Sequence, residues 1–215
     1  MEIQPQETSE GMKKLTKELI NEGYLKTPNI IEAFQKIDRR DFVPKELKDE
    51  AYFNIPLYIG HGQTISQPLT VAFMLELLQP KEKDKILDVG SGSGWQTALL
   101  SQIVGEKGKV FALEIIPTLK DFGEKNVSQY NFIQKGIAHF YCLNATEGLP
   151  NEAPFDKIIA AASVQKIPTA WKNQLKIEGR MVVPVKEALY LLIKKEKGQF
   201  EEQIFPGFVF VPFVF

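Results

Sequence analysis

Three glycines at alternate positions, Gly90, Gly92 and Gly94, follow a short apolar run over residues 85–89 and precede a helical pattern that begins at Trp95. Because glycine has no Cβ, such a turn can fold tightly and let a ligand approach the backbone closely. The free amides at the start of the following helix favour electron-rich ligand groups. The stretch therefore predicts a site for a nucleotide-like cofactor.

The spacing of the loop separates it from two common phosphate-binding loops. A dinucleotide loop has the pattern G-x-G-x-x-G, and a P-loop needs a lysine after its last glycine, where this chain has Trp95. Asp88 lies two residues before the first glycine, and Glu114 lies twenty residues after the last one, where the next strand is predicted to end. An acid at that place typically accepts hydrogen bonds from ribose hydroxyls. Taken alone, the loop is also compatible with a simple tight turn, and Glu114 with a solvated acid at a strand end.

A second polar stretch lies upstream. Residues 60–68 read Gly-His-Gly-Gln-Thr-Ile-Ser-Gln-Pro and end where a helix is predicted over residues 68–78. From residue types alone, Ser66 is best interpreted as the N-cap of that helix, because serine ahead of a first-turn proline is a good start signal.

Composition indicates one α/β domain of a soluble protein. The chain has 215 residues, 44% hydrophobic and 25% charged, with a net charge of −1. Its scattered lysines and arginines argue against a nucleic-acid partner bound through a bulk basic surface, while leaving room for a local patch. The single Cys142 lies in an apolar run that predicts a buried strand, and one cysteine fits a reducing compartment. Residues 1–5 are polar, unlike a signal peptide, and no apolar run is long enough to cross a bilayer. We therefore expect a cytoplasmic protein with no membrane partner.

Hydrophobic periodicity predicts the elements that must position these residues. Helices are expected over 8–22, 28–37, 68–78, 95–104, 118–130 and 169–175, with residues 45–67 irregular. Strands are expected over 86–89, 110–115, 139–143, 155–161, 180–184, 189–194 and 204–213. This alternation predicts a parallel sheet covered on both faces, and the short link at 195–198 predicts that the last two strands are antiparallel. The chain is thus expected to be a single domain, with an N-terminal helical cap over 1–80 and a cofactor-binding core over 81–215.

An acid followed by Gly-x-Gly-x-Gly, with a second acid at the end of the next strand, resembles the cofactor site of the class I S-adenosylmethionine methyltransferases. The resemblance implies a Rossmann-like, mostly parallel seven-stranded sheet with an antiparallel strand near the C-terminus. It also implies S-adenosylmethionine as cofactor, S-adenosylhomocysteine as product, no metal, and Glu114 on the ribose hydroxyls. The cofactor-binding residues implied are Thr64, Ile65, Asp88, Gly90, Ser91, Gly92, Ser93, Gly94, Glu114, Ile115, Leu143 and Asn144.

The stretch Gly-Gln-Thr-Ile-Ser-Gln-Pro over residues 62–68 closely resembles the signature of the protein-L-isoaspartate (D-aspartate) O-methyltransferase family. Further similar stretches lie at 38–44, 148–156, 167–168, 174–176, 179–185 and 208–212, so the resemblance covers nearly the whole chain. It implies a repair enzyme that methylates the free α-carboxylate of L-isoaspartyl, and also D-aspartyl, residues in damaged proteins and peptides. On this resemblance Ser66 is the catalytic residue, and Thr64 and Ile65 line the cofactor pocket beside it.

The chain departs from the family pattern at residues 143–145. The family usually has Gly-Asp-Gly there, and its aspartate helps to hold the adenine end of the cofactor, whereas this chain has Leu143-Asn144-Ala145. Asn144 keeps a carbonyl acceptor but loses the charge, so we expect cofactor binding to survive and to weaken. Lys186 also replaces a usual glycine.

The implied reaction needs no strong base. A carboxylate with a pKa of about 4 is already ionised at neutral pH, which fits a site built around a serine. His61 is expected to be an ordinary loop residue. Two alternatives stay open: a methyltransferase of the same fold that acts on another peptide carboxylate, and a cofactor-binding module with weak or lost activity. We expect a monomer without a nucleic-acid partner.

Overall fold

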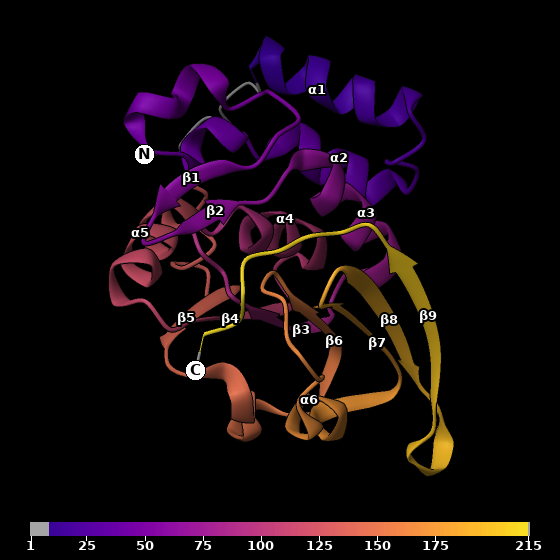
Figure 1. Ribbon diagram of the computed structural model, residues 1–215. Helices are drawn as coiled ribbons and strands as arrows, with labels where there is room; N and C mark the ends of the chain where they lie inside the picture. Colours follow the sequence, from indigo (N-terminus) through magenta and orange to yellow (C-terminus); the bar gives the residue numbers. More distant parts are fainter. Residues whose placement is uncertain (1–8, 215) are drawn as a thin grey trace.

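The apolar runs pair into one sheet in the computed structural model, which describes residues 9–214 (Figure 1). Within those residues the sheet has seven strands in the order β5-β4-β3-β6-β7-β8-β9. The strands are β3 (Lys85–Val89), β4 (Lys109–Glu114), β5 (Ala138–Cys142), β6 (Phe155–Ala160), β7 (Leu175–Val185), β8 (Ala188–Lys194) and β9 (Phe200–Pro206). Strands β3 to β7 are parallel to one another, whereas β8 is antiparallel to both β7 and β9. The predicted fold class is confirmed.

The central strands are buried along almost their whole length, as expected for parallel strands covered on both faces. One core lies on the side of helix α4 (Trp95–Val104) and contains Trp95 and Ile86. A second core lies on the side of the short helix α6 (Thr169–Gln174) and contains Trp171 and Leu87. Figure 1 shows α4 and α6 on opposite sides of the sheet. Helix α5 (Pro117–Ser128) contacts α4 and joins it in covering β4 and β5.

Three N-terminal helices lie on the α4 side of the sheet: the third contacts the sheet strands, the second packs on α4, and the first packs on the second. They are α1 (Glu10–Asn21), α2 (Pro28–Lys36) and α3 (Pro68–Leu78). Ser9 caps α1 by accepting a hydrogen bond from the Met12 amide at 3.3 Å. In α2, the ring of Phe34 meets that of Trp95 edge to face, with centroids 5.5 Å apart. The division into segments 1–80 and 81–215 stays a prediction, and the expectation about a signal peptide concerns residues outside the described part.

The segment predicted to be irregular contains regular structure. A 3-10 helix, η2 (Lys45–Glu50), is followed by a hairpin of β1 (Leu57–Gly60) and β2 (Gln63–Ile65). Strands of four and three residues are too short to show an alternating pattern, so residues 57–65 carry no recognisable strand signal. The remaining 3-10 helices are η1 (Arg39–Phe42), η3 (Ala145–Glu147), η4 (Pro150–Glu152) and η5 (Glu196–Gly198).

The last predicted strand, residues 204–213, is wrong in its bounds. Strand β9 begins at Phe200 and ends at Pro206, and Gly207 with φ +91° turns the chain out of the sheet. The following residues cross to the end of β6, where the Ser163 amide donates to the Val211 carbonyl at 2.8 Å. Strand β7 also begins earlier than predicted, at Leu175. None of the helices in the described part of the chain is long and apolar enough to cross a membrane.

Candidate active site

The glycine loop wraps the carboxyl end of β3. The amides of Gly90 and Ser91 both donate to the Leu113 carbonyl of β4, at 2.8 and 3.1 Å. Gly90, Gly92 and Gly94 have φ values of +76°, +51° and +86°, which non-glycine residues rarely adopt. The three glycines are therefore required by the backbone path of the loop.

Helix α5 packs directly on this loop through Gly123. A Cβ atom on Gly123 would lie only 2.7 Å from the Gly92 carbonyl oxygen, and one on Gly94 would lie 2.8 Å from the Gly123 oxygen. Asn126, one turn further along α5, donates its side-chain amide to the Ser93 carbonyl at 3.0 Å. The sequence analysis missed both residues. A glycine inside a helical pattern was the available signal, because such a glycine usually has a packing reason.

Asp88 ties the end of β3 to the first turn of α4. It is fully buried, and its two oxygens accept from Gln96 Nε2 at 2.7 Å and Thr97 Oγ1 at 2.6 Å. Burial raises the pKa of the Asp88 carboxyl to about 6; the two hydrogen bonds oppose this shift and the negative charge of Glu114 adds to it. The side chain thus fixes the end of β3, which precedes the loop, to the start of α4, which follows it.

Glu114 ends β4 and holds the loop from the opposite side. Its Oε2 accepts from the Gly92 amide and its Oε1 accepts from the Ile116 amide, both at 3.0 Å. Each carboxylate oxygen can accept more than one hydrogen bond. Glu114 can therefore fix the loop and still accept a hydrogen bond from a ligand hydroxyl.

A cavity that is partly open to solvent lies between the loop, the β1–β2 hairpin and the C-terminal segment. Predicted site residues from both stretches line it together: Thr64, Ile65, Ser66, Gly90, Ser91, Gly92, Ser93, Glu114, Ile115 and Leu143. Residues 211–214 also line the cavity, which sequence analysis did not anticipate.

Three predicted cofactor residues lie outside the lining of this cavity. Asp88 is bonded to the first turn of α4, and Gly94 is the loop residue that packs against Gly123 of α5. Asn144 is exposed, and its Oδ1 accepts from the Thr146 amide at 2.9 Å and the Thr146 hydroxyl at 2.6 Å, which caps η3. Their contact with a cofactor stays a prediction.

Two polar atoms at the cavity have an unmet hydrogen-bonding capacity. Among the described residues, the Ser91 hydroxyl and the Trp95 indole Nε1 are buried and make no hydrogen bond, and both residues line the cavity. Buried polar atoms are nearly always paired, so such atoms at a cavity fit a polar ligand. Donors, acceptors and apolar side chains here match the mixed surface of S-adenosylmethionine.

Ser66 lies between β2 and α3 and is not the N-cap of α3. The N-cap is Gln67, whose own side chain makes no capping hydrogen bond, and Asn54 Oδ1 instead accepts from the first-turn amide of Leu69 at 2.9 Å. The interpretation of Ser66 as a helix cap is therefore wrong, and the residue instead lines the cavity. Its carbonyl accepts from Arg39 Nη2 at 3.1 Å.

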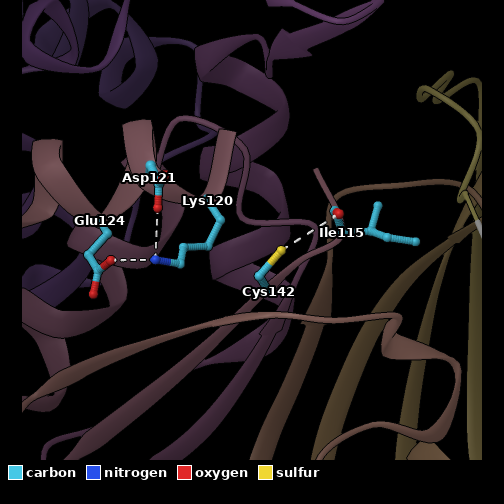
Figure 2. Close-up of polar contacts among 5 residues, drawn as sticks. All are labelled: Ile115, Lys120, Asp121, Glu124 and Cys142. Atoms are coloured by element: carbon cyan, nitrogen blue, oxygen red, sulfur yellow. Dashed lines mark hydrogen bonds and ion pairs between the residues drawn. The ribbon is translucent and has the colours of Figure 1, made fainter. Parts of the chain in front are cut away.

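Cys142 was expected in the core but is exposed. It is the last residue of β5, an edge strand, and its Sγ points to the Ile115 carbonyl at 3.8 Å (Figure 2). An apolar run predicts a strand without showing whether that strand is central or at an edge.

Figure 2 also shows Lys120 of α5 between Asp121 and Glu124, at 2.9 and 2.8 Å, and these contacts raise the pKa of the lysine ammonium above its usual range.

His61 lies at the tip of the β1–β2 hairpin, consistent with a loop residue. Its Nε2 forms a hydrogen bond of 2.8 Å with the Thr118 hydroxyl in the first turn of α5. The contact joins the hairpin that carries Thr64 to the helix that supports the glycine loop.

This sheet, with a glycine loop after β3 and an acid at the end of β4, defines a class I S-adenosylmethionine methyltransferase fold. The model of the protein-L-isoaspartate (D-aspartate) O-methyltransferase family matches residues 10–215. The chain belongs to this family.

Similar proteins of known name cover nearly the whole chain. Protein-L-isoaspartate O-methyltransferases of Methanopyrus kandleri and Ignicoccus hospitalis are each 38% identical to it, over 94% and 95% of this chain and 90% and 98% of theirs. A solved protein-L-isoaspartate O-methyltransferase is 27% identical with a TM-score of 0.84, covering 94% of this chain and 65% of its own. A Plasmodium falciparum structure assigned to this enzyme type, in complex with S-adenosyl-L-homocysteine, has the same fold, with a TM-score of 0.83, 23% identity and coverage of 96% and 99%.

Proposed function

We propose that the cavity holds S-adenosylmethionine against the glycine loop and brings its reactive end to Ser66. As a member of its family, the protein is a protein-L-isoaspartate O-methyltransferase that acts in protein repair. The observation that carries the proposal for the site is that two stretches more than twenty residues apart in the sequence line one cavity. One stretch ends in Ser66, and the other is residues 90–93 of the glycine loop.

The residues that would hold the cofactor fall into two groups. Glu114 would accept hydrogen bonds from the ribose hydroxyls, while the backbone of residues 90–93 and the unpaired Ser91 hydroxyl would contact the amino-acid portion. Leu143 and Ile115 contact the adenine side. When bound, S-adenosylmethionine supplies an electrophilic methyl group on a sulfonium centre.

The side chains around Ser66 supply alignment. The substrate carboxylate is already ionised, so the Ser66 hydroxyl donates a hydrogen bond that orients it, and no general base is needed. The apolar residues 211–214 and Ile65 exclude water from the reacting groups. An anion and a cation combine into neutral products here, and an apolar site does not oppose that change.

A paired-peptide assay on Ser66→Ala tests the proposal. One peptide carries an L-isoaspartyl residue and its twin an ordinary aspartyl residue, and methyl transfer is measured for both. A hydrogen bond to a charged group contributes about 1.5–3 kcal/mol, so kcat/KM for the isoaspartyl peptide should fall about 10- to 150-fold. Affinity for S-adenosylhomocysteine, measured by calorimetry, should stay unchanged.

The control is Ser128→Ala on α5, whose hydroxyl donates to the Lys125 carbonyl away from the cavity. Unchanged turnover in Ser66→Ala would remove this serine from the mechanism. Equal labelling of both peptides by the wild type would instead indicate another peptide carboxylate as acceptor, and binding without labelling would indicate a cofactor-binding module. We further propose that the enzyme works as a cytoplasmic monomer and does not bind nucleic acid, which its near-neutral net charge supports.

A further inference from the structure

Arg39 of η1 is a fully buried arginine that sequence analysis did not single out. Its Nη1 donates to the carbonyls of Ala51 and Phe53, at 2.7 and 3.2 Å. Its Nη2 donates to the carbonyls of Ile55 and Ser66, at 2.9 and 3.1 Å. One guanidinium thus joins the segment before the β1–β2 hairpin to the segment after it.

The same guanidinium lies over the indole ring of Trp95, 5.3 Å from its centroid. Trp95 opens α4 and lines the cofactor cavity. Arg39 therefore contacts both halves of the site, the half that carries Ser66 and the half that carries the glycine loop.

The charge on Arg39 has no carboxylate partner in the described part of the chain. Burial lowers the pKa of its guanidinium to about 9, which leaves it protonated at neutral pH. A buried charge without an ion-pair partner is costly, and here only carbonyl dipoles and the Trp95 ring offset that cost. Arg39 also stabilises the fold, because its removal would leave four carbonyl oxygens without their donor.

We propose that Arg39 is a positioning residue, which fixes the main chain at Ser66 relative to Trp95 and so sets the distance between the carboxylate and the methyl donor. The inference rests on the proposed role of Ser66. A planar fork of donors can serve four carbonyls and an aromatic face at once, whereas the ammonium of a lysine cannot reproduce that geometry. A misplacement of about 1 Å in such an alignment can cost about 100-fold in rate.

The test compares Arg39→Lys with Arg40→Gln. Arg40 is the adjacent arginine, half-exposed, with a surface ion pair of 3.6 Å to Asp49, and serves as the matched control. All assays use saturating S-adenosylmethionine, which stabilises the folded state, at a temperature where circular dichroism shows the native signal. For Arg39→Lys we expect kcat on the isoaspartyl peptide to fall about 10- to 100-fold, with KM for the cofactor and affinity for S-adenosylhomocysteine changed less than about threefold. Arg40→Gln should match the wild type.

A second readout is chemical rescue. In Arg39→Gly, added ethylguanidinium at a non-denaturing concentration should restore part of the lost kcat, while ethylammonium should not. A kcat for Arg39→Lys within twofold of the wild type would overturn the proposal, as would a variant that remains unfolded with saturating cofactor, because Arg39 would then serve the fold alone. If the wild type itself does not methylate the isoaspartyl peptide, the proposed function fails instead.

Discussion

Gly123 offers a sharp test of how α5 supports the cofactor loop. Replacement by alanine suits the helix, because alanine is favoured over glycine by about 0.8–1.0 kcal/mol in a helix interior. The new Cβ, however, would lie 2.7 Å from the Gly92 oxygen and 3.3 Å from the Gly94 nitrogen. Ordinary van der Waals contact begins at 3.4 Å, so the Gly92 carbonyl must retreat by about 0.7 Å, the difference between these two distances.

Gly123→Ala should change both the free energy of unfolding and the affinity for the ligand. Overpacking of this kind costs about 1–3 kcal/mol, which the helix preference partly offsets, so the free energy of unfolding should fall by about 2 kcal/mol or less. A displaced Gly92 should also weaken ligand binding. Its amide donates to Glu114, the residue proposed to accept from the ribose hydroxyls, so the two groups should move together. Affinity for S-adenosylhomocysteine should therefore fall about tenfold or more, which corresponds to about 1.4 kcal/mol.

Calorimetric titration with S-adenosylhomocysteine and thermal unfolding measure the two effects separately. Gly198→Ala in the β8–β9 turn is the control: its φ is +72° and a Cβ there would meet nothing within 4 Å. Strain from the left-handed conformation should cost Gly198→Ala about 1–2 kcal/mol of stability without changing affinity. Wild-type affinity in Gly123→Ala would refute the reasoning that α5 sets the position of the loop.

Two further predictions concern the pH dependence of stability through Asp88 and the hydrogen bonds of Tyr130. The pKa of Asp88 is raised to about 6, so the folded state holds the carboxyl proton more tightly than the unfolded state does. Ionisation of Asp88 should therefore lower the free energy of unfolding as the pH rises from about 4 to 6, by at most about 3 kcal/mol. Asp88→Asn should abolish that decline in urea unfolding measured across this range, and an unchanged pH profile would contradict the assignment. Tyr130→Phe should cost about 1–3 kcal/mol, because Tyr130 Oη donates to Asp41 at 2.7 Å and accepts from the Asp38 amide at 2.9 Å. An unchanged urea midpoint for Tyr130→Phe would show that water replaces these bonds.

Prediction from the sequence succeeded where burial makes a continuous signal. Strands β3, β4 and β6 are buried along most of their length and are mostly apolar because both faces are covered, and helices α3 and α4 have the predicted bounds. It failed where local pattern carries little information. Strand β9 lies at an edge and exposes Glu201 and Glu202, so its polar half showed no strand signal. The aromatic residues after Pro206 do show such a signal, and the strand was therefore predicted too far along the chain.

The sequence by itself determined the glycine loop, the acid at the end of β4, and the serine stretch that identifies the family. These are local features, because glycine conformation and short motifs depend on residues close together in the chain. Only the tertiary structure decided that Gly123 packs on the loop, that Arg39 links Ser66 to Trp95, and that residues 211–214 line the cavity. Such contacts join residues far apart in sequence, and no local pattern records which distant backbone a side chain will meet.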